Sequence, residues 1–200
     1  GDLGSSASEA DARTARYAFL RELAQKHKAE KIVTAHHQDD LLESMVLGMM
    51  RSSGYRSLVP MSAQDILRPL IHKRKSEMID YAKEHKLEWR EDPSNTDETY
   101  LRNYVRKNIM PKLESARAPL LQINDDMKER LIDIDMRTGS LVPTNNTLSR
   151  SRYSIMPYVV LCEVARAWLV RSGVEEVDSK MIGRMATGIK TLQVGKKIDI

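Results

Sequence analysis

The sequence predicts an α/β protein, with a truncated Rossmann-like parallel sheet and flanking helices followed by a smaller all-helical domain. Three observations support this prediction. Residues 8–35 are patterned as a helix and then a short apolar strand, and a second helix follows from about residue 39. Polar residues cluster directly after that strand, where open parallel sheets place their ligands. Beyond about residue 120, apolar residues follow only helical spacing.

The first third of the chain alternates helix and strand. Residues 8–11 resemble a helix-capping box, and apolar residues at helical spacing follow, which predicts a helix over about 8–28. The apolar and β-branched run at 32–35 predicts a short buried strand. A helix over 39–50 comes next. Its buried face is expected to carry Leu42, Met45, Val46 and Met49.

The next segment mixes extended and helical patterns. Residues 66–71 are expected to be extended, because Pro69 disfavours a helical conformation at Arg68. The remaining expected elements of this segment are a helix over 76–85, a short strand over 87–89, a turn-rich loop over 91–97 and a helix over 99–108.

The second half has helical periodicity only. We expect a charged linker helix over about 119–137, a loop or hairpin over 138–152, and amphipathic helices over 156–171 and 179–190. We therefore divide the chain into an α/β domain at 1–117, incomplete at its amino end, and a linker helix with a helical domain at 118–200.

Composition limits the class of protein. The net charge of +4 permits a polyanionic partner without requiring one. The single cysteine, Cys162, lies in an apolar stretch, so a buried structural thiol is favoured and disulfides or Cys-x-x-Cys metal sites are excluded within the chain. No apolar run approaches the roughly 18 residues of a membrane span, and no signal peptide is visible. These features predict a cytoplasmic protein without a membrane partner.

The densest group of titratable residues is His36, His37, Asp39 and Asp40, directly after the predicted strand. Three interpretations stay open. The group could bind a metal ion, because histidine and carboxylate suit divalent ions. It could lie beside a nucleotide at the end of the sheet. It could also only cap the next helix, where aspartate is favourable without any chemistry.

A second polar group lies about sixty residues further on. Arg102 and Arg106 are four residues apart, so they share one helix face with Asn103 beside them. Two guanidinium groups on one face suit phosphate or carboxylate recognition, and a solvated helix face is the alternative. Asp92 and Asn95 suit a simple Asx turn. The isolated basic residues are Arg51, Arg56 and Arg68.

Taken together, these segments resemble the tRNA(Ile)-lysidine synthetases of the N-type ATP pyrophosphatase group. The resemblance covers residues 8–115 and weakens over 153–200. It is carried by Ser8-Glu9, Ala12-Arg13, Arg16-Tyr17, Thr34-Ala-His-His-Gln-Asp-Asp40 with Glu43, Arg51-Ser-Ser-Gly54, Arg68-Pro-Leu70, Asp92-Pro-Ser-Asn95 and Arg102-Asn-Tyr-Val-Arg106 with Pro111.

The resemblance implies a reaction. Members of this family use ATP to adenylate C2 of the wobble cytidine in a CAU-anticodon isoleucine tRNA, and free L-lysine then displaces AMP to form lysidine. It implies ATP and Mg²⁺ as cofactors, with Asp39 and Asp40 as metal ligands, and leaves a homodimer open. The implied catalytic residues are His36, Asp39, Asp40 and Glu43. The implied tRNA- or phosphate-binding residues are Arg51, Arg56, Arg68, Asp92, Asn95, Arg102, Asn103 and Arg106.

The chain also departs from the family pattern. The family's Ser-Gly-Gly-x-Asp-Ser loop, which cradles pyrophosphate, does not occur in these 200 residues, so we interpret them as an incomplete enzyme and expect them to bind ATP poorly. Ser44 and Ser57 replace a threonine and a glycine usual in the family. A non-catalytic tRNA-binding module on the same scaffold is therefore one alternative. Another ATP-pyrophosphatase-type tRNA-modifying enzyme is a second, although thiolation enzymes use cysteine pairs, and a metal-dependent phosphohydrolase is a third.

Overall fold

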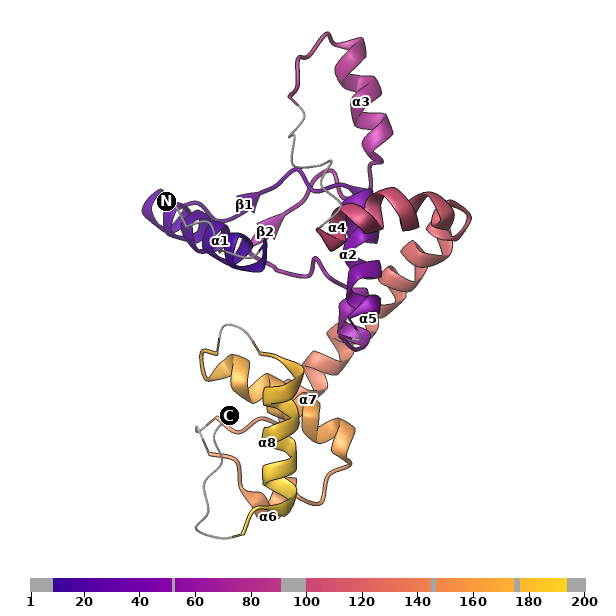
Figure 1. The fold of residues 1–200 in the computed structure, drawn as a ribbon. Helices are drawn as coiled ribbons and strands as arrows, with labels where there is room; N and C mark the ends of the chain where they lie inside the picture. Colours follow the sequence, from indigo (N-terminus) through magenta and orange to yellow (C-terminus); the bar gives the residue numbers. More distant parts are fainter. Residues whose placement is uncertain (1–8, 52, 91–99, 145–146, 175–176, 194–200) are drawn as a thin grey trace. The chain divides into compact units, whose positions relative to one another are not determined.

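The computed structural model describes residues 9–51, 53–90, 100–144, 147–174 and 177–193 (Figure 1). The chain forms two compact units. The first unit comprises residues 1–52 and 59–121, and the second comprises residues 53–58 and 122–200. Asp92 and Asn95, which the family resemblance implies as tRNA- or phosphate-binding residues, lie outside the described residues. Within the described residues, no helix is long and apolar enough to cross a bilayer.

The first unit contains a two-stranded parallel sheet, which confirms the predicted α/β class. Strand β1 (Ile32–Val33) pairs with β2 (Ile66–Leu67), with Ile32 opposite Ile66 and Val33 opposite Leu67. Ile32 and Ile66 are buried, whereas Val33 and Leu67 point to the other face and are more than half exposed. This alternation is the two-residue period of a strand with one covered face. Helix α1 (Glu9–Lys26) precedes β1 (Figure 1).

Two helices of this unit end in the same way. Lys28 after α1 and Lys86 after α3 (Lys75–Glu84) both have φ near +54°. In each case the next backbone N–H bonds back to a carbonyl five residues earlier, at 2.8 Å. This left-handed closure satisfies carbonyl groups that a helix end leaves without partners. It also turns the chain out of α1 toward β1.

Helix α2 (Gln38–Met50) begins directly after β1 and carries the candidate site. Its buried residues include Leu41, Leu42, Met45, Val46 and Leu47. Val46 and Leu47 pack against Val105, which is fully buried. The expectation that Met49 is buried is wrong, because that side chain is 44% exposed. The buried stripe includes Leu41 and Leu47 instead, since the helix packs on Val105 through its middle turns.

The segment that packs on α2 is helical but irregular. Helix α4 (Leu101–Tyr104) continues through a π-helical turn, η3 (Val105–Ile109), and a 3₁₀ segment, η4 (Met110–Ala116). Helix α5 (Arg117–Leu141) follows. The expected helix near 99–108 is thus present, but the expected loop from 138 is wrong up to Leu141, where α5 ends. The expected strand at 87–89 is also wrong, because these residues are coil and exposed.

The second unit is all-helical in the part that the structure describes, as predicted. It contains η1 (Tyr55–Leu58), most of α5, α6 (Arg150–Tyr153), α7 (Tyr158–Arg171) and α8 (Ser179–Thr191). Helix α6 is a second departure from the expected loop. Its Tyr153 is 1% exposed and donates a hydrogen bond from Oη to the carbonyl oxygen of Leu141 at 2.7 Å.

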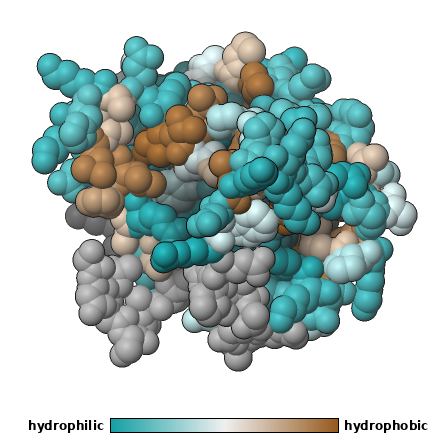
Figure 2. All heavy atoms as spheres, turned by 90° about the horizontal axis from the view of Figure 1, so that it is seen from above, coloured by the Kyte–Doolittle hydropathy of each residue, from teal (hydrophilic) through white to brown (hydrophobic). Residues whose placement is uncertain are grey.

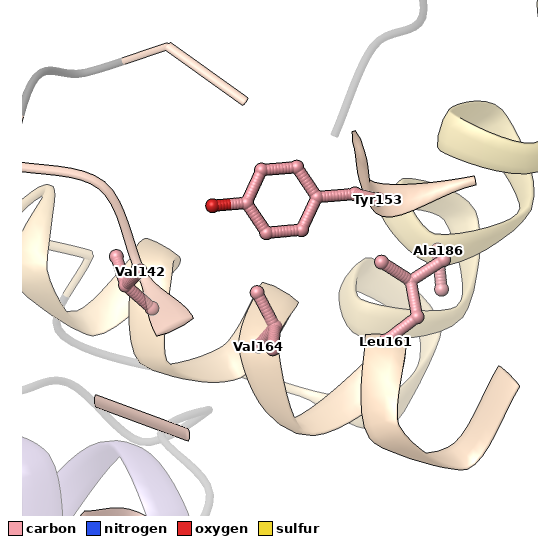
Figure 3. Packing of buried hydrophobic residues seen from close by; sticks show 5 residues of the cluster. All are labelled: Val142, Tyr153, Leu161, Val164 and Ala186. Atoms are coloured by element: carbon pink, nitrogen blue, oxygen red, sulfur yellow. The ribbon is translucent and has the colours of Figure 1, made fainter. Parts of the chain in front are cut away.

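The core of this unit joins three helices and the end of α5. Figure 3 shows Tyr153 and Val142 with residues of α7 and α8, namely Leu161, Val164 and Ala186. Helix α8 begins at Asp178, whose carboxylate accepts a hydrogen bond from the Met181 N–H at 2.7 Å. Figure 2 shows the chain from above the view of Figure 1, where hydrophobic side chains lie between hydrophilic ones. Burial of one face of α7 and α8 accounts for their predicted amphipathicity.

Candidate active site at the start of helix α2

The candidate site lies where β1 and β2 end at the same edge of the sheet. The Thr34 N–H extends the pairing by donating to the Leu67 carbonyl at 3.0 Å. His37 then caps α2: its ring Nδ1 accepts from the Asp40 N–H at 3.4 Å, and the His37 N–H donates to Asp40 Oδ2 at 3.0 Å. This capping box explains why a helix starts here. It also fixes the direction of the Asp40 carboxylate.

Asp39 is held by its neighbours on both oxygens. Its Oδ2 accepts a hydrogen bond from the Lys75 backbone N–H at 2.8 Å, and its Oδ1 accepts from Arg117 Nη2 at 2.7 Å. Burial alone would raise the pKa of Asp39, but these two hydrogen bonds outweigh it and lower the pKa. Asp39 is therefore an ionised carboxylate that joins the starts of α2, α3 and α5.

Asp40 faces a different set of groups. Its Oδ1 lies 3.8 Å from Arg102 Nη2 and 3.9 Å from Arg106 Nη2. Both distances are too long for direct hydrogen bonds, so the carboxylate attracts the two guanidinium groups through space. Asp40 thus offers one oxygen toward the arginines, while the other is engaged by the helix cap.

Glu43, one turn further along α2, binds the same two arginines directly. Its side chain is only 2% exposed. Arg102 Nε donates to Oε2 at 3.2 Å, and Arg106 donates from Nε to Oε1 at 2.7 Å and from Nη2 to Oε2 at 2.9 Å. The hydrogen bonds that Arg106 donates to Glu43 raise the pKa of Arg106. The two polar segments, about sixty residues apart in the sequence, therefore meet in the structure. Asn103, which follows Arg102 in the sequence, is also buried.

His36 lies at the same edge and is neutral at pH 7. Its Nδ1 is 2.8 Å from the Thr34 hydroxyl. Burial lowers the pKa of His36, and the charges of Arg68, Arg13 and Arg102 lower it further, against an opposing effect of Asp40. A neutral imidazole there can accept a proton or a hydrogen bond.

The three isolated arginines that the sequence analysis selected lie in three different parts of the structure. Arg68 follows β2 and donates from Nη1 to the carbonyls of Met61 and Ile66, while its buried Nε has no hydrogen-bond partner among the described residues. Arg51 is exposed at the end of α2. Arg56 belongs to the second unit, where Glu163 and Asp135 bind it. Only Arg68 therefore lies at the edge that holds His36.

Sequence reasoning missed Arg117. Its side chain is 11% exposed and donates to Gln38 Oε1 at 2.9 Å, to Asp39 Oδ1 at 2.7 Å and to Glu114 Oε2 at 3.0 Å. Arg117 opens α5, where a cation is unfavourable with respect to the helix dipole. Because the sequence placed the start of this helix at about residue 119, no local signal pointed to Arg117.

The assignment of Asp39 and Asp40 as magnesium ligands stays a prediction. Each oxygen of Asp39 already accepts one hydrogen bond, so a magnesium ion at Asp39 would share those oxygens with Lys75 and Arg117. Across the residues that the structure describes, no three histidine, cysteine or acidic side chains group as a metal site. The arrangement that the structure does contain is a buried carboxylate, Glu43, and a partly exposed one, Asp40, beside two guanidinium groups. Such a site can bind an amine and a phosphate side by side.

Comparison with known proteins identifies the family to which residues 2–113 are similar. The model of the PP-loop domain family matches residues 2–113. The chain is 44% identical to a tRNA(Ile)-lysidine synthase of Histophilus somni over 111 residues, which are 52% of this chain and 26% of that protein. It is 38% identical over 152 residues to the synthase of Pseudomonas aeruginosa, covering 68% and 34%. With the synthase of Methylococcus capsulatus it shares 31% over 194 residues, covering 88% and 44%. The chain spans less than half the length of these curated relatives.

Proposed function

The chain belongs to the PP-loop domain family, and from that premise we propose that the native protein is an ATP-dependent ligase that modifies tRNA. The proposed reaction has two steps at the wobble cytidine of isoleucine tRNA with a CAU anticodon. The O2 oxygen of the cytidine attacks the α-phosphate of ATP and pyrophosphate leaves. The amino group of free lysine then attacks C2, and AMP leaves with that oxygen while the amine loses a proton.

The observation that carries this proposal is the meeting of Asp40 and Glu43 with Arg102 and Arg106 at the carboxyl edge of the parallel strands. The second step needs an amine beside a departing phosphate. A carboxylate such as Asp40 attracts the ammonium group of lysine, and guanidinium groups stabilise the negative charge that develops on AMP. Glu43 holds both guanidinium groups in place through three hydrogen bonds.

His36 completes the proposed set of roles. Lysine must lose a proton before or as its nitrogen attacks, and burial keeps the His36 ring neutral at pH 7. The neutral ring can accept that proton directly or through water. Arg68, whose buried Nε has no hydrogen-bond partner among the described residues, is a second candidate for contact with phosphate oxygens.

In our proposal, Arg102 and Arg106 contact phosphate oxygens, and Asp39 is not a magnesium ligand. Mg²⁺ accompanies ATP in phosphate chemistry and offsets its charge, and Asp39 is not one of its ligands in our proposal. Asp40 remains a candidate through Oδ1 alone. We assign no step of the reaction to the metal ion.

Transfer of labelled lysine tests the proposal. The native protein would be incubated with ATP, Mg²⁺, labelled lysine and an unmodified CAU-anticodon isoleucine tRNA. We expect label in the tRNA and equal amounts of AMP and pyrophosphate. The matched substrate control is the same tRNA with uridine at the wobble position, which should accept no lysine.

Two variants connect the reaction to the site. Asp40→Asn keeps the size of the side chain but removes its charge, so lysine transfer should fall by about 10–100-fold through a raised KM for lysine. Asp133→Asn removes an exposed carboxylate of α5 and should leave transfer unchanged. Binding of tRNA without any lysine transfer by the wild-type protein would instead favour a non-catalytic tRNA-binding module.

A further inference from the structure

The two neighbouring aspartates of α2 have opposite surroundings. Each oxygen of Asp39 accepts one hydrogen bond, Oδ2 from a backbone N–H and Oδ1 from a guanidinium group, so both oxygens hold neighbouring segments. Asp40 keeps Oδ1 at 3.8–3.9 Å from Arg102 and Arg106. Consecutive residues of a helix point about 100° apart, so one aspartate can hold the helix while the other faces the site.

Arg117 is the residue that holds Asp39 away from the role of Asp40, because it binds the Asp39 carboxylate. It lies in the first unit, at the start of α5, and contacts both Gln38 and Asp39 in the first turn of α2. Its third acceptor, Glu114, keeps the guanidinium plane in place. Three acceptors on one planar group restrain its rotation more tightly than a lysine ammonium could.

We propose that Arg117 is a positioning residue for the ligation reaction: through Asp39 it fixes the first turn of α2, so that Asp40 and Glu43 face Arg102 and Arg106. The inference rests on the proposed function. Asp39, on this proposal, binds neither metal nor lysine. It transmits the position of Arg117 to the turn that carries Asp40.

The physical reason is the freedom of a helix end. The first turn of a helix has backbone N–H groups without partners in the helix and frays more easily than its middle. The His37–Asp40 capping box restrains this turn from one side, and the Arg117–Asp39 ion pair restrains it from the other. Without Arg117, the Asp39 carboxylate would remain half-buried without its main counter-charge, and the turn would shift to expose it.

A shift of this turn would act on lysine more than on ATP. Misplacement of a reacting group by about 1 Å can cost around 100-fold in rate. Asp40 is the residue assigned to the lysine ammonium, whereas the arginines assigned to phosphate come from α4 and η3. The kinetic constants for lysine should therefore change while KM for ATP stays constant.

The test uses the native protein with Arg117→Met, Arg117→Lys, Asp39→Asn and the double variant Arg117→Met/Asp39→Asn. At a temperature where circular dichroism shows every variant folded, Arg117→Met should lower kcat/KM for lysine by about 10–100-fold. Arg117→Lys should restore part of this loss. The double variant should be no slower than the worse single variant, because both substitutions break one interaction. Arg137→Met, which removes an exposed arginine of α5, is the matched control and should behave as wild type.

Three results would count against the inference, and they differ from failure of the proposed function. One is a lysine kcat/KM of Arg117→Met within about twofold of wild type. Another is an equal loss for lysine and ATP, which indicates general disruption. A third is a double variant whose loss is the product of the two single losses. Wild-type protein that transfers no lysine refutes the proposed function itself, and with it the reaction that Arg117 would serve.

Discussion

Substitution of Glu43 by glutamine removes one charge and one acceptor oxygen from the centre of the site and keeps the size of the side chain. The carboxylate is 2% exposed and accepts three hydrogen bonds from Arg102 and Arg106. Glutamine has the same shape, but its amide offers one oxygen acceptor and carries no charge. The two guanidinium groups would then face each other across a neutral side chain, with Asp40 as the nearest remaining carboxylate among the residues that the structure describes.

The cost follows from burial. Removing one partner of a buried ion pair costs about 3–5 kcal/mol. Here the arginines keep 20% and 31% of their side-chain surface exposed, and Asp40 stays within 3.9 Å of both. Solvent and Asp40 offset part of the loss, so we expect about 2–3 kcal/mol. For a chain of this size, that lowers the midpoint of thermal unfolding by roughly 5–10 °C.

Thermal unfolding followed by circular dichroism measures the effect. Asp133→Asn serves as the control, because its ion pair with Arg137 on α5 is exposed and should leave the midpoint unchanged. A midpoint for Glu43→Gln equal to that of wild type would show that Glu43 does not compensate two arginines in a buried environment. Glu43, Arg102 and Arg106 would then not form the buried charged cluster on which the phosphate-binding site depends.

Three further outcomes are expected. The pKa of Asp39 is lower in the folded protein than the unfolded value of about 3.9, so ionised Asp39 stabilises the fold above that pH. This stabilisation is lost as pH falls through the lower folded pKa. Asp39→Asn should therefore reduce the loss of stability that acid causes below about pH 4. Tyr153→Phe removes a buried hydrogen bond to the Leu141 carbonyl and should lower the free energy of unfolding by about 1–2 kcal/mol in urea titrations, whereas an unchanged value would contradict the buried contact. Binding of isoleucine tRNA by the native protein should weaken steeply as salt rises in filter-binding assays, since phosphate contacts release counterions, and salt-independent binding would oppose the proposed partner.

Local sequence patterns were sufficient to predict the long helices and the two extended segments that pair in the sheet, but not α6. The strand at Ile32 and the start of α2 follow from an apolar run and a capping sequence, both of which depend on neighbours in the chain. The prediction of a strand at 87–89 was wrong for a non-local reason. Leu87 and Trp89 have the composition of a strand, but a strand needs a pairing partner, and β1 and β2 pair only with each other among the described residues.

The site was predictable in part. The histidine–aspartate group and the arginine pair could be identified from residue types and spacing, and the structure brings them together at Glu43. The roles of individual residues depend on contacts between segments far apart in the chain. Arg117 reaches Asp39 from 78 residues away. No local pattern specifies such a contact, which is why neighbouring aspartates looked equivalent in the sequence.

The same limit applies to the basic residues. Arg56 looked like a candidate phosphate ligand, but Glu163, 107 residues further along, accepts its hydrogen bonds together with Asp135. Whether an arginine meets a carboxylate or stays available to an anion depends on the folded structure, since both uses exploit the same planar donor group. The sequence therefore supports a positively charged protein more firmly than it supports any one arginine as a ligand.

Mass spectrometry of nucleosides from the modified tRNA tests the central claim most directly. Isoleucine tRNA treated with the native protein, ATP, Mg²⁺ and lysine would be digested, and the nucleoside from the wobble position would be identified. We predict a cytidine derivative heavier by one lysine less one water, and its near absence when Asp40→Asn or Glu43→Gln replaces the wild-type protein. An unmodified wobble cytidine after treatment with the wild-type protein, or full modification by both variants, would contradict a lysine-ligating site at the start of α2.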